Sequence, residues 1–467
     1  MSRDAVIRAL HAYYDDGRFL ADLSRRVAIP TESQNPDRRP DLYRYCNEEI
    51  APALQALGYT VSVYDNPDPS GGPFMIARRI EAPDALTVLT YGHGDVVRGL
   101  DKDWRAGLSP WTVTTEGDRI YGRGVVDNKG QHTINIAALA AVLATRGRLG
   151  FNSIIFIEMS EEVGSPGIHA FAEAHRAELT ADLLIGSDGP RVAIETPTLY
   201  MGSRGAMNLE LILDLREGGH HSGNWGGLLA NPGTILAHAL ASIVDRNGAI
   251  LVPELKPTTI PDSVRRALAG ITVDAGADGP AIDTWWGEPG LTPAEKVYGW
   301  NTFEVLSFVT GNPDNPVNAV PPRAVAHCQI RFTVDTDPDA FIPALRRHLD
   351  ANGFESVVVR EAPGRTRWQA TRLDPEEPIV RWGAESVVRT TGTKPALLPC
   401  LGGSMPNDVW ADMLGMPTLW VPHSYAGCSQ HAPNEHGLGT IFREGLAIMG
   451  GLFWDLGEAR PPLAARN

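Results

Sequence analysis

Histidine and acidic residues follow three apolar segments of the chain that have the composition of buried strands. The segments span residues 86–91, 154–157 and 182–185. The side chains that follow are His93 and Asp95, then Glu158, Glu161 and Glu162, then Ser187 and Asp188. In an open α/β sheet, ligands bind beyond the carboxyl ends of the strands. Imidazole and carboxylate groups gathered there have the chemistry of a zinc site.

Two further motifs supply the same kinds of side chain. Asp127 lies in a glycine-rich loop at 122–130, and His431 follows a fourth predicted strand at 418–421. Each motif alone has an ordinary structural explanation. A lone aspartate usually forms a turn or caps a helix, and a glutamate pair before a helix compensates the helix dipole. Their joint placement at one edge of a sheet favours a metal site over these separate explanations.

Taken in order, the motifs resemble those of the dinuclear zinc peptidase and deacylase family that includes carnosinase, glutamate carboxypeptidase, aminoacylase and succinyl-diaminopimelate desuccinylase. The matching residues are His93-Gly94-Asp95, Gly122-Arg123-Gly124, Asp127-Asn128-Lys129-Gly130, Glu161-Glu162, Ser187-Asp188, Gly402-Gly403-Ser404 and His431 through Glu435. They span most of the chain, and the combination is far more specific than any single motif.

The resemblance implies two Zn²⁺ ions per chain, which Co²⁺ or Mn²⁺ could replace. It assigns five ligands: Asp127 as the bridge, His93 and Asp188 at one ion, and Glu162 and His431 at the other. It also implies a cis peptide bond between Asp127 and Asn128. Two other histidines lie near His431 in the sequence. We expect His436 to lie within the following helix as a structural residue, and His423 to be at most a neighbour of the ligands.

Two acidic residues beside the predicted ligands have separate expected roles. Asp95 lies two residues after His93, so in an extended chain both side chains leave on the same face and Asp95 can orient the imidazole. The resemblance makes Glu161 the general base, which takes a proton from water and passes it to the leaving amine. The alternative is that Glu161 and Glu162 are both merely solvated.

The middle of the chain carries residues expected to contact the substrate. His221 matches a histidine that, in the carnosinase-like branch, reaches across a dimer to stabilise the carbonyl oxyanion. The resemblance also places Asn318, Arg331, Gly403 and Ser404 at the substrate, and Arg331 could hold a carboxylate through two hydrogen bonds. The alternatives are a loop histidine without a role and a surface salt bridge for Arg331.

The elements that must position these residues form an α/β catalytic domain with a mixed central sheet, as in zinc exopeptidases. A smaller α+β lid and dimerisation domain interrupts it. We place the catalytic domain at 1–202 and 373–467, and the inserted domain at 203–372. The predicted helices are 131–145, 165–177, 340–350 and 434–449; the predicted half-exposed strands are 208–214 and 326–334; and 250–300 is a long excursion.

The composition and charge of the chain argue against some classes of binding partner. The 467 residues suit two domains. A formal charge of −15, from 41 basic and 56 acidic side chains, argues against nucleic acid or anionic lipid as the main partner. The four cysteines form no close pair, and no run approaches the roughly 20 apolar residues that span a bilayer. The N-terminus lacks an apolar signal stretch, so we expect a cytoplasmic protein without a membrane partner.

These observations predict a hydrolase that cleaves an amide bond in a dipeptide or short peptide and works as a homodimer joined through the lid. An N-acyl-amino-acid deacylase with the same mechanism is the alternative. A non-catalytic zinc-binding dimerisation protein is more remote, because it would not need Glu161. No Gly-x-Ser-x-Gly motif suggests a serine hydrolase. Cys400-Leu401 stands where carnosinase-like relatives often carry an acidic residue or an arginine, which weakens the case for carnosinase-type specificity.

Overall fold

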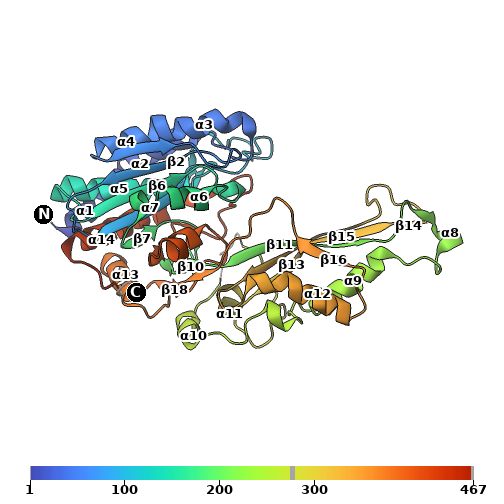
Figure 1. Cartoon of the computed structure of the whole chain (residues 1–467). Coiled ribbons are helices and arrows are strands. Elements are labelled where there is room, and N and C mark those ends of the chain that lie inside the picture. The colour runs from blue at the N-terminus through green and yellow to red at the C-terminus, as the bar shows by residue number, and fades with distance from the viewer. Residues whose placement is uncertain (1, 274–278, 464–467) are drawn as a thin grey trace.

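The computed structural model describes residues 2–273 and 279–463. Figure 1 shows a large α/β body built from both ends of the chain and an elongated lid built from its middle. The blue N-terminal and red C-terminal segments lie together in the large body, while the middle of the chain, drawn mainly in light green, yellow and light orange, extends away from it. Residues far apart in sequence therefore meet in the large body.

The large body is organised around an eight-stranded sheet in the order β1-β2-β6-β3-β7-β19-β9-β18. Its middle strands β6, β3, β7 and β19 are parallel, whereas β1 and β2 run antiparallel at one edge. The strands span Thr60–Tyr64 (β1), Phe74–Arg79 (β2), Thr87–His93 (β3), Asn152–Glu158 (β6), Leu183–Gly186 (β7), Thr198–Tyr200 (β9), Ala396–Leu398 (β18) and Thr418–Trp420 (β19). The predicted mixed sheet is confirmed.

Both faces of this sheet are buried, which explains why β3 and β6 are continuous apolar runs rather than alternating ones. One face packs against α1, α2, α5, α13 and α14, and the other packs against α6 and α7. The helices span Arg3–Asp15 (α1), Arg18–Val27 (α2), Lys129–Arg146 (α5), Ile168–Ala174 (α6), Arg176–Leu179 (α7), Pro378–Thr391 (α13) and Gly439–Glu458 (α14). The carboxyl ends of β3, β6 and β7 therefore open at one edge.

The lid is a four-stranded antiparallel sheet in the order β13-β15-β11-β16, with α9 and α12 packed on one face. These elements span Gly205–Asp214 (β11), Thr302–Thr310 (β13), Arg323–Phe332 (β15), Val358–Glu361 (β16), Pro232–Ile243 (α9) and Phe341–Ala351 (α12). Beyond the sheet, β12 (His220–His221) pairs with β14 (Ala319–Val320), next to α8 (Ser222–Trp225). In Figure 1 this pair forms the end of the lid that lies farthest from the large body.

Two chain crossings connect the lid to the large body, and they lie side by side. Strand β10 (Gly202–Ser203) pairs antiparallel with β17 (Thr371–Arg372). The domain limits, which remain a prediction, fall at this pair. The excursion within residues 250–300 contributes α10 (Asp262–Leu268) and α11 (Pro293–Tyr298). Their apolar side chains pack with Tyr200 and Trp410 of the large body rather than with the core of the lid.

Two helices differ from their predicted limits. The helix predicted at 165–177 begins only at Ile168, because Gly167 adopts a left-handed conformation, and it breaks at His175 into α6 and α7. The closing helix predicted at 434–449 begins at Gly439, because β21 (His436–Leu438) first pairs with β5 (Arg119–Tyr121). The placement of His436 within a helix is therefore wrong.

The helix α14 also runs beyond its predicted end, through Gly450 and Gly451 to Glu458. A Cβ atom on Gly450 would lie only 2.3 Å from a methyl carbon of Leu10, so this glycine lets α14 approach α1 closely. Close tertiary packing thus outweighs the low helix propensity of glycine. Within the described residues, no helix is long and apolar enough to cross a membrane.

Candidate metal centre

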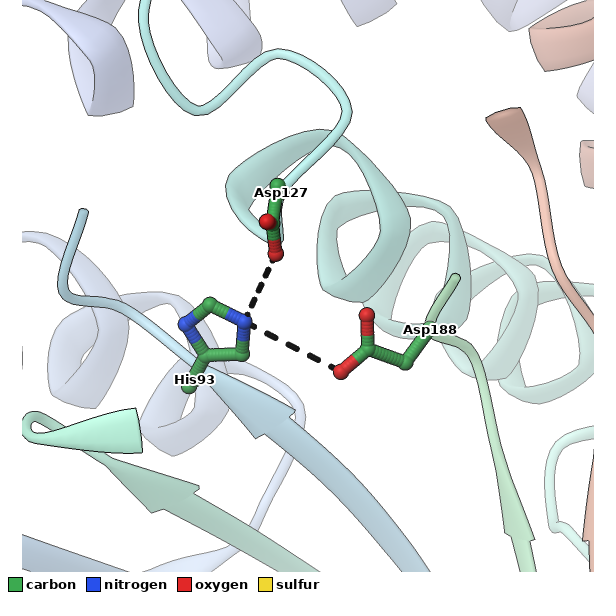
Figure 2. Close-up of side chains that lie close together, drawn as sticks. All are labelled: His93, Asp127 and Asp188. Carbon is green, nitrogen blue, oxygen red and sulfur yellow. Dashed lines mark hydrogen bonds and ion pairs between the residues drawn. The ribbon is translucent and has the colours of Figure 1, made fainter. Parts of the chain in front are cut away.

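The first group of residues that could hold a metal ion lies where β3, the loop before α5 and the segment after β7 meet. Figure 2 shows the imidazole of His93 pointing at the carboxylates of Asp127 and Asp188. His93 Nε2 lies 2.9 Å from Asp127 Oδ1 and 3.8 Å from Asp188 Oδ2. All three residues are buried. Three ligand atoms of the types that zinc prefers thus converge on one point.

A second group shares Asp127 with the first. His431 Nε2 lies 2.9 Å from Asp127 Oδ2 and 3.1 Å from Glu162 Oε2. One potential ligand atom from each of Asp127, Glu162 and His431 lies within 4.8 Å of the others. The two oxygens of Asp127 therefore face two separate histidines. A carboxylate in this position is able to bridge two cations.

The peptide bond between Asp127 and Asn128 is cis, as the resemblance implied. Asn128 does not point into either group. Its side-chain amide donates to the carbonyl oxygen of Ser187 at 2.8 Å, and its Oδ1 lies 3.2 Å from Nδ1 of His132. Asn128 thus supports the surrounding backbone and His132 rather than either group of ligands.

Asp95 connects the two groups through hydrogen bonds. Its Oδ1 lies 3.4 Å from Nδ1 of His93, and its main-chain oxygen lies 3.1 Å from the same atom. Its two carboxylate oxygens also accept from the backbone amides of Glu161 and Glu162, each at 3.1 Å. Asp95 is fully buried. It therefore holds both the imidazole of His93 and the short helix η3 (Glu161–Val163) that carries the glutamate pair.

The electrostatics of the centre favour cations. Burial raises the pKa of Glu162 to about 7 and that of Asp188 to about 6, and the charge on Asp127 adds to both rises. Burial also raises the pKa of Glu161 well above its usual range. Crowded buried carboxylates ionise readily only beside positive charge. Three carboxylate ligands and two imidazoles thus fit a pair of divalent ions.

The side chains of the two adjacent glutamates have different surroundings. The carboxylate of Glu162 faces His431, whereas no hydrogen bond from a described residue reaches the carboxylate of Glu161. Both glutamates, together with Asp127, Asp188 and His431, line a cavity of about 810 Å³. This volume suits a small ligand. A carboxylate free of protein partners beside such a cavity is available for proton transfer.

Three of the predicted substrate contacts also line this cavity: Arg331, Gly403 and Ser404. The guanidinium of Arg331 donates to Gln329 Oε1 and to Ser404 Oγ, both at 2.9 Å. No carboxylate within the described part of the chain forms an ion pair with it. The surface salt bridge that was the alternative for Arg331 is therefore absent from the described residues.

The other two predicted substrate residues do not reach the cavity. His221 and Asn318 lie together at the far end of the lid, where the amide of Ser222 donates to the carbonyl of Asn318 at 2.8 Å. Both residues are exposed. Figure 1 shows β14 and α8, which mark this region, far from the ends of β6 and β7. Within one chain, the structure separates them from the metal groups.

Sequence reasoning missed the role of Glu435, although Glu435 and Arg123 both lie in matched motifs. Arg123 Nη1 donates to Glu435 Oε2 at 2.6 Å, and the amides of Gly124 and Val126 donate to Oε1 at 2.9 and 3.2 Å. This buried contact fixes the loop that ends at Asp127. Gln430 was missed as well, and its amide donates to Asp127 Oδ2 at 2.6 Å. Spacing alone does not reveal such contacts.

His423 and His436 lie away from the metal groups. His423 Nε2 lies 3.1 Å from Ser187 Oγ, and the backbone amide of His423 donates to Gln131. His436 Nε2 lies 2.6 Å from the hydroxyl of Tyr425. Both side chains are buried in these contacts, so His431 is the histidine that the structure brings to Glu162.

The sequence pattern of Peptidase family M20/M25/M40 matches residues 89–454. The chain is 25% identical to the Beta-Ala-His dipeptidase of Homo sapiens, over 97% of this chain and 93% of that protein. It is also 25% identical to the cysteinylglycine-S-conjugate dipeptidase of Corynebacterium striatum, over 84% and 85% of the two chains. The fold is similar to that of the solved dipeptidase Dug1p from Saccharomyces cerevisiae, with a TM-score of 0.82 at 21% identity, covering 98% and 99% of the chains.

Proposed function

Because the chain belongs to Peptidase family M20/M25/M40 and is therefore a metal-dependent hydrolase, we propose that it is a dinuclear zinc dipeptidase. The observation that carries this proposal is the carboxylate of Asp127, which lies between two separate histidine and carboxylate pairs at one end of a cavity. The relatives named above are dipeptidases, and they support a dipeptide or a similarly small peptide as the substrate.

Five residues would hold the metal ions: Asp127 as the shared ligand, His93 and Asp188 on one side, and Glu162 and His431 on the other. Bound zinc supplies Lewis acidity, which makes water acidic near neutral pH and polarises a carbonyl group. Glu161 takes the proton of the attacking water and delivers it to the leaving amine. Asp95 keeps Glu161 in position through the amide hydrogen bond described above.

The cavity residues bind the substrate in this scheme. Arg331 binds the terminal carboxylate, for which its guanidinium has no competing carboxylate partner among the described residues. Gly403 and Ser404 line the same wall, and Ser404 Oγ accepts from Arg331 while donating to the carbonyl of Arg204. This chain of contacts holds the Arg331 guanidinium in a fixed orientation.

A homodimer would bring His221, and with it Asn318, to the cavity of the neighbouring chain. Strand β13 lies at the edge of the lid sheet and leaves Val305, Leu306, Phe308 and Val309 between 40% and 59% exposed. An apolar edge strand of this kind favours pairing with a second copy about a two-fold axis. His221 would then stabilise the oxyanion that forms on the scissile carbonyl.

Mixing two inactive variants tests this arrangement. His221→Ala and Glu161→Gln chains should each be nearly inactive alone. In a mixed dimer, one of the two sites keeps its own Glu161 and receives an intact His221, so subunit exchange should restore part of the activity. Activity assays with and without exchange, verified by mass spectrometry, measure the recovery. A fully active monomer, or no recovery despite verified exchange, would contradict the proposal.

The competing function is that of an N-acyl-amino-acid deacylase, which uses the same metal centre. A panel of dipeptides and N-acyl amino acids, assayed with zinc-loaded protein, decides between the two. We expect the dipeptides to give the higher kcat/KM. Hydrolysis of acyl amino acids alone would replace the proposal, and a loaded protein that cleaves neither class would favour the non-catalytic alternative.

The four buried free cysteines support a reducing cytoplasm as the location.

A further inference from the structure

We infer that Arg365 selects substrates that carry an acidic side chain in addition to the terminal carboxylate. Arg365 lies on the lid segment between β16 and β17 and lines the cavity that holds Glu161 and Arg331. The inference rests on the proposed peptidase function and adds a substrate class to it. It does not depend on the second copy of the chain.

The acidic residues that line the cavity already have roles in the metal centre, whereas the basic residues do not. The acidic residues among those that line it are Asp127, Glu161, Glu162 and Asp188, and the centre described above assigns all four to the metals and the general base. The cationic residues left over are Arg331 and Arg365. A second ammonium group on the substrate would find no free carboxylate among the described lining residues. A second carboxylate would find a guanidinium.

The lid segment that carries Arg365 is attached next to the glutamate pair. The hydroxyl of the next residue, Thr366, donates to the carbonyl of Gly164 at 3.1 Å, and Gly164 directly follows the short helix that carries Glu161 and Glu162. Two residues farther on, Trp368 exchanges backbone hydrogen bonds with Ala206 at 3.0 Å in both directions. Hydrogen bonds thus attach the lid segment on one side to the end of η3, which carries Glu161 and Glu162, and on the other side to β11.

The guanidinium of Arg365 has no carboxylate partner among the described residues, and Arg365 is exposed and lines the cavity. Its neighbour Arg367 differs in this respect. Arg367 forms ion pairs with Asp339 at 2.7 Å and Glu361 at 3.4 Å, and it does not line the cavity. Two arginines on one short segment therefore provide a test residue and a matched control.

The experiment compares peptides that differ only in charge. Zinc-loaded protein is assayed with Ala-Glu against Ala-Gln, and with Glu-Ala against Gln-Ala. We expect the acidic member of at least one pair to have the higher kcat/KM. Arg365→Gln should lower that preference by about three- to tenfold, which is the modest scale expected of an exposed charge pair. The loss should appear mainly in KM, because such a pair stabilises the bound substrate and its transition state to a similar extent. Added salt should weaken the preference in the same direction.

Two further variants sharpen the result. Arg365→Glu should invert the preference, so that the dipeptide with lysine at the selected position becomes a better substrate than the one with glutamate there. Arg367→Gln should leave the charge preference at its original value. Equal rates within both peptide pairs, or a preference that survives Arg365→Gln, would overturn the inference while leaving the peptidase function intact. A loaded protein that cleaves none of these peptides would overturn both.

Discussion

Glu161→Gln should lower kcat by about a hundredfold or more, which is the scale expected when a general base is removed. The glutamine keeps the shape of the side chain but cannot take the proton of the attacking water. The metal ions should stay bound, because the carboxylate of Glu161 belongs to neither metal-binding group. Steady-state kinetics and elemental analysis of the same preparation measure the two effects together.

Glu162→Gln is the matched comparison, since the two residues are adjacent and both donate their backbone amides to Asp95. This variant should lose metal affinity, and excess zinc should restore part of its activity. Excess zinc should not rescue Glu161→Gln. If Glu161→Gln retained near-native turnover, another group would have to act as the base.

Asp127→Ala should lose both metal ions and, with them, measurable activity. Asp127 is the one residue common to the two metal-binding groups found among the described residues. Its removal takes a ligand from each ion and leaves the remaining carboxylates without their shared partner. The metal content measured by elemental analysis after dialysis should therefore fall from about two ions per chain to nearly none.

Asp188→Ala provides the control for this loss. Asp188 belongs only to the group around His93, so this variant should release one ion more readily than the other. A zinc titration followed by competition with a chelator would separate the two sites. Undiminished metal content in Asp127→Ala would show that Asp127 is not the bridge.

The catalytic body was largely predictable because its signals are local. Strands buried on both faces are continuous apolar runs, and the limits of β3, β6 and β7 each lie within one or two residues of the predicted ones. Parallel strands bring their carboxyl ends to one edge, so the residues that follow them had to lie close together. The placement of His93 and Asp188 follows from that geometry, whereas Asp127 comes from the loop before α5.

Features that depend on distant contacts were not predictable in the same way. Helix α14 begins late because His436–Leu438 pair with Arg119–Tyr121, a partner far away in the sequence. The packing of Val264 and Tyr298 on the large body could not be predicted, because the composition of the excursion at 250–300 resembles that of a loop. Neither periodicity nor motif spacing carries information about such partners.

The ion pair between Arg123 and Glu435 joins residues that are 312 positions apart, and this separation has a consequence for synthesis. The ribosome delivers His93, Asp127, Glu162 and Asp188 first, then the entire lid, and only after the lid His431 and Glu435. Until then the loop at Asp127 lacks its buried clamp, and one metal site lacks a ligand. Nascent chains should therefore acquire their full metal complement only after the whole lid has been synthesised.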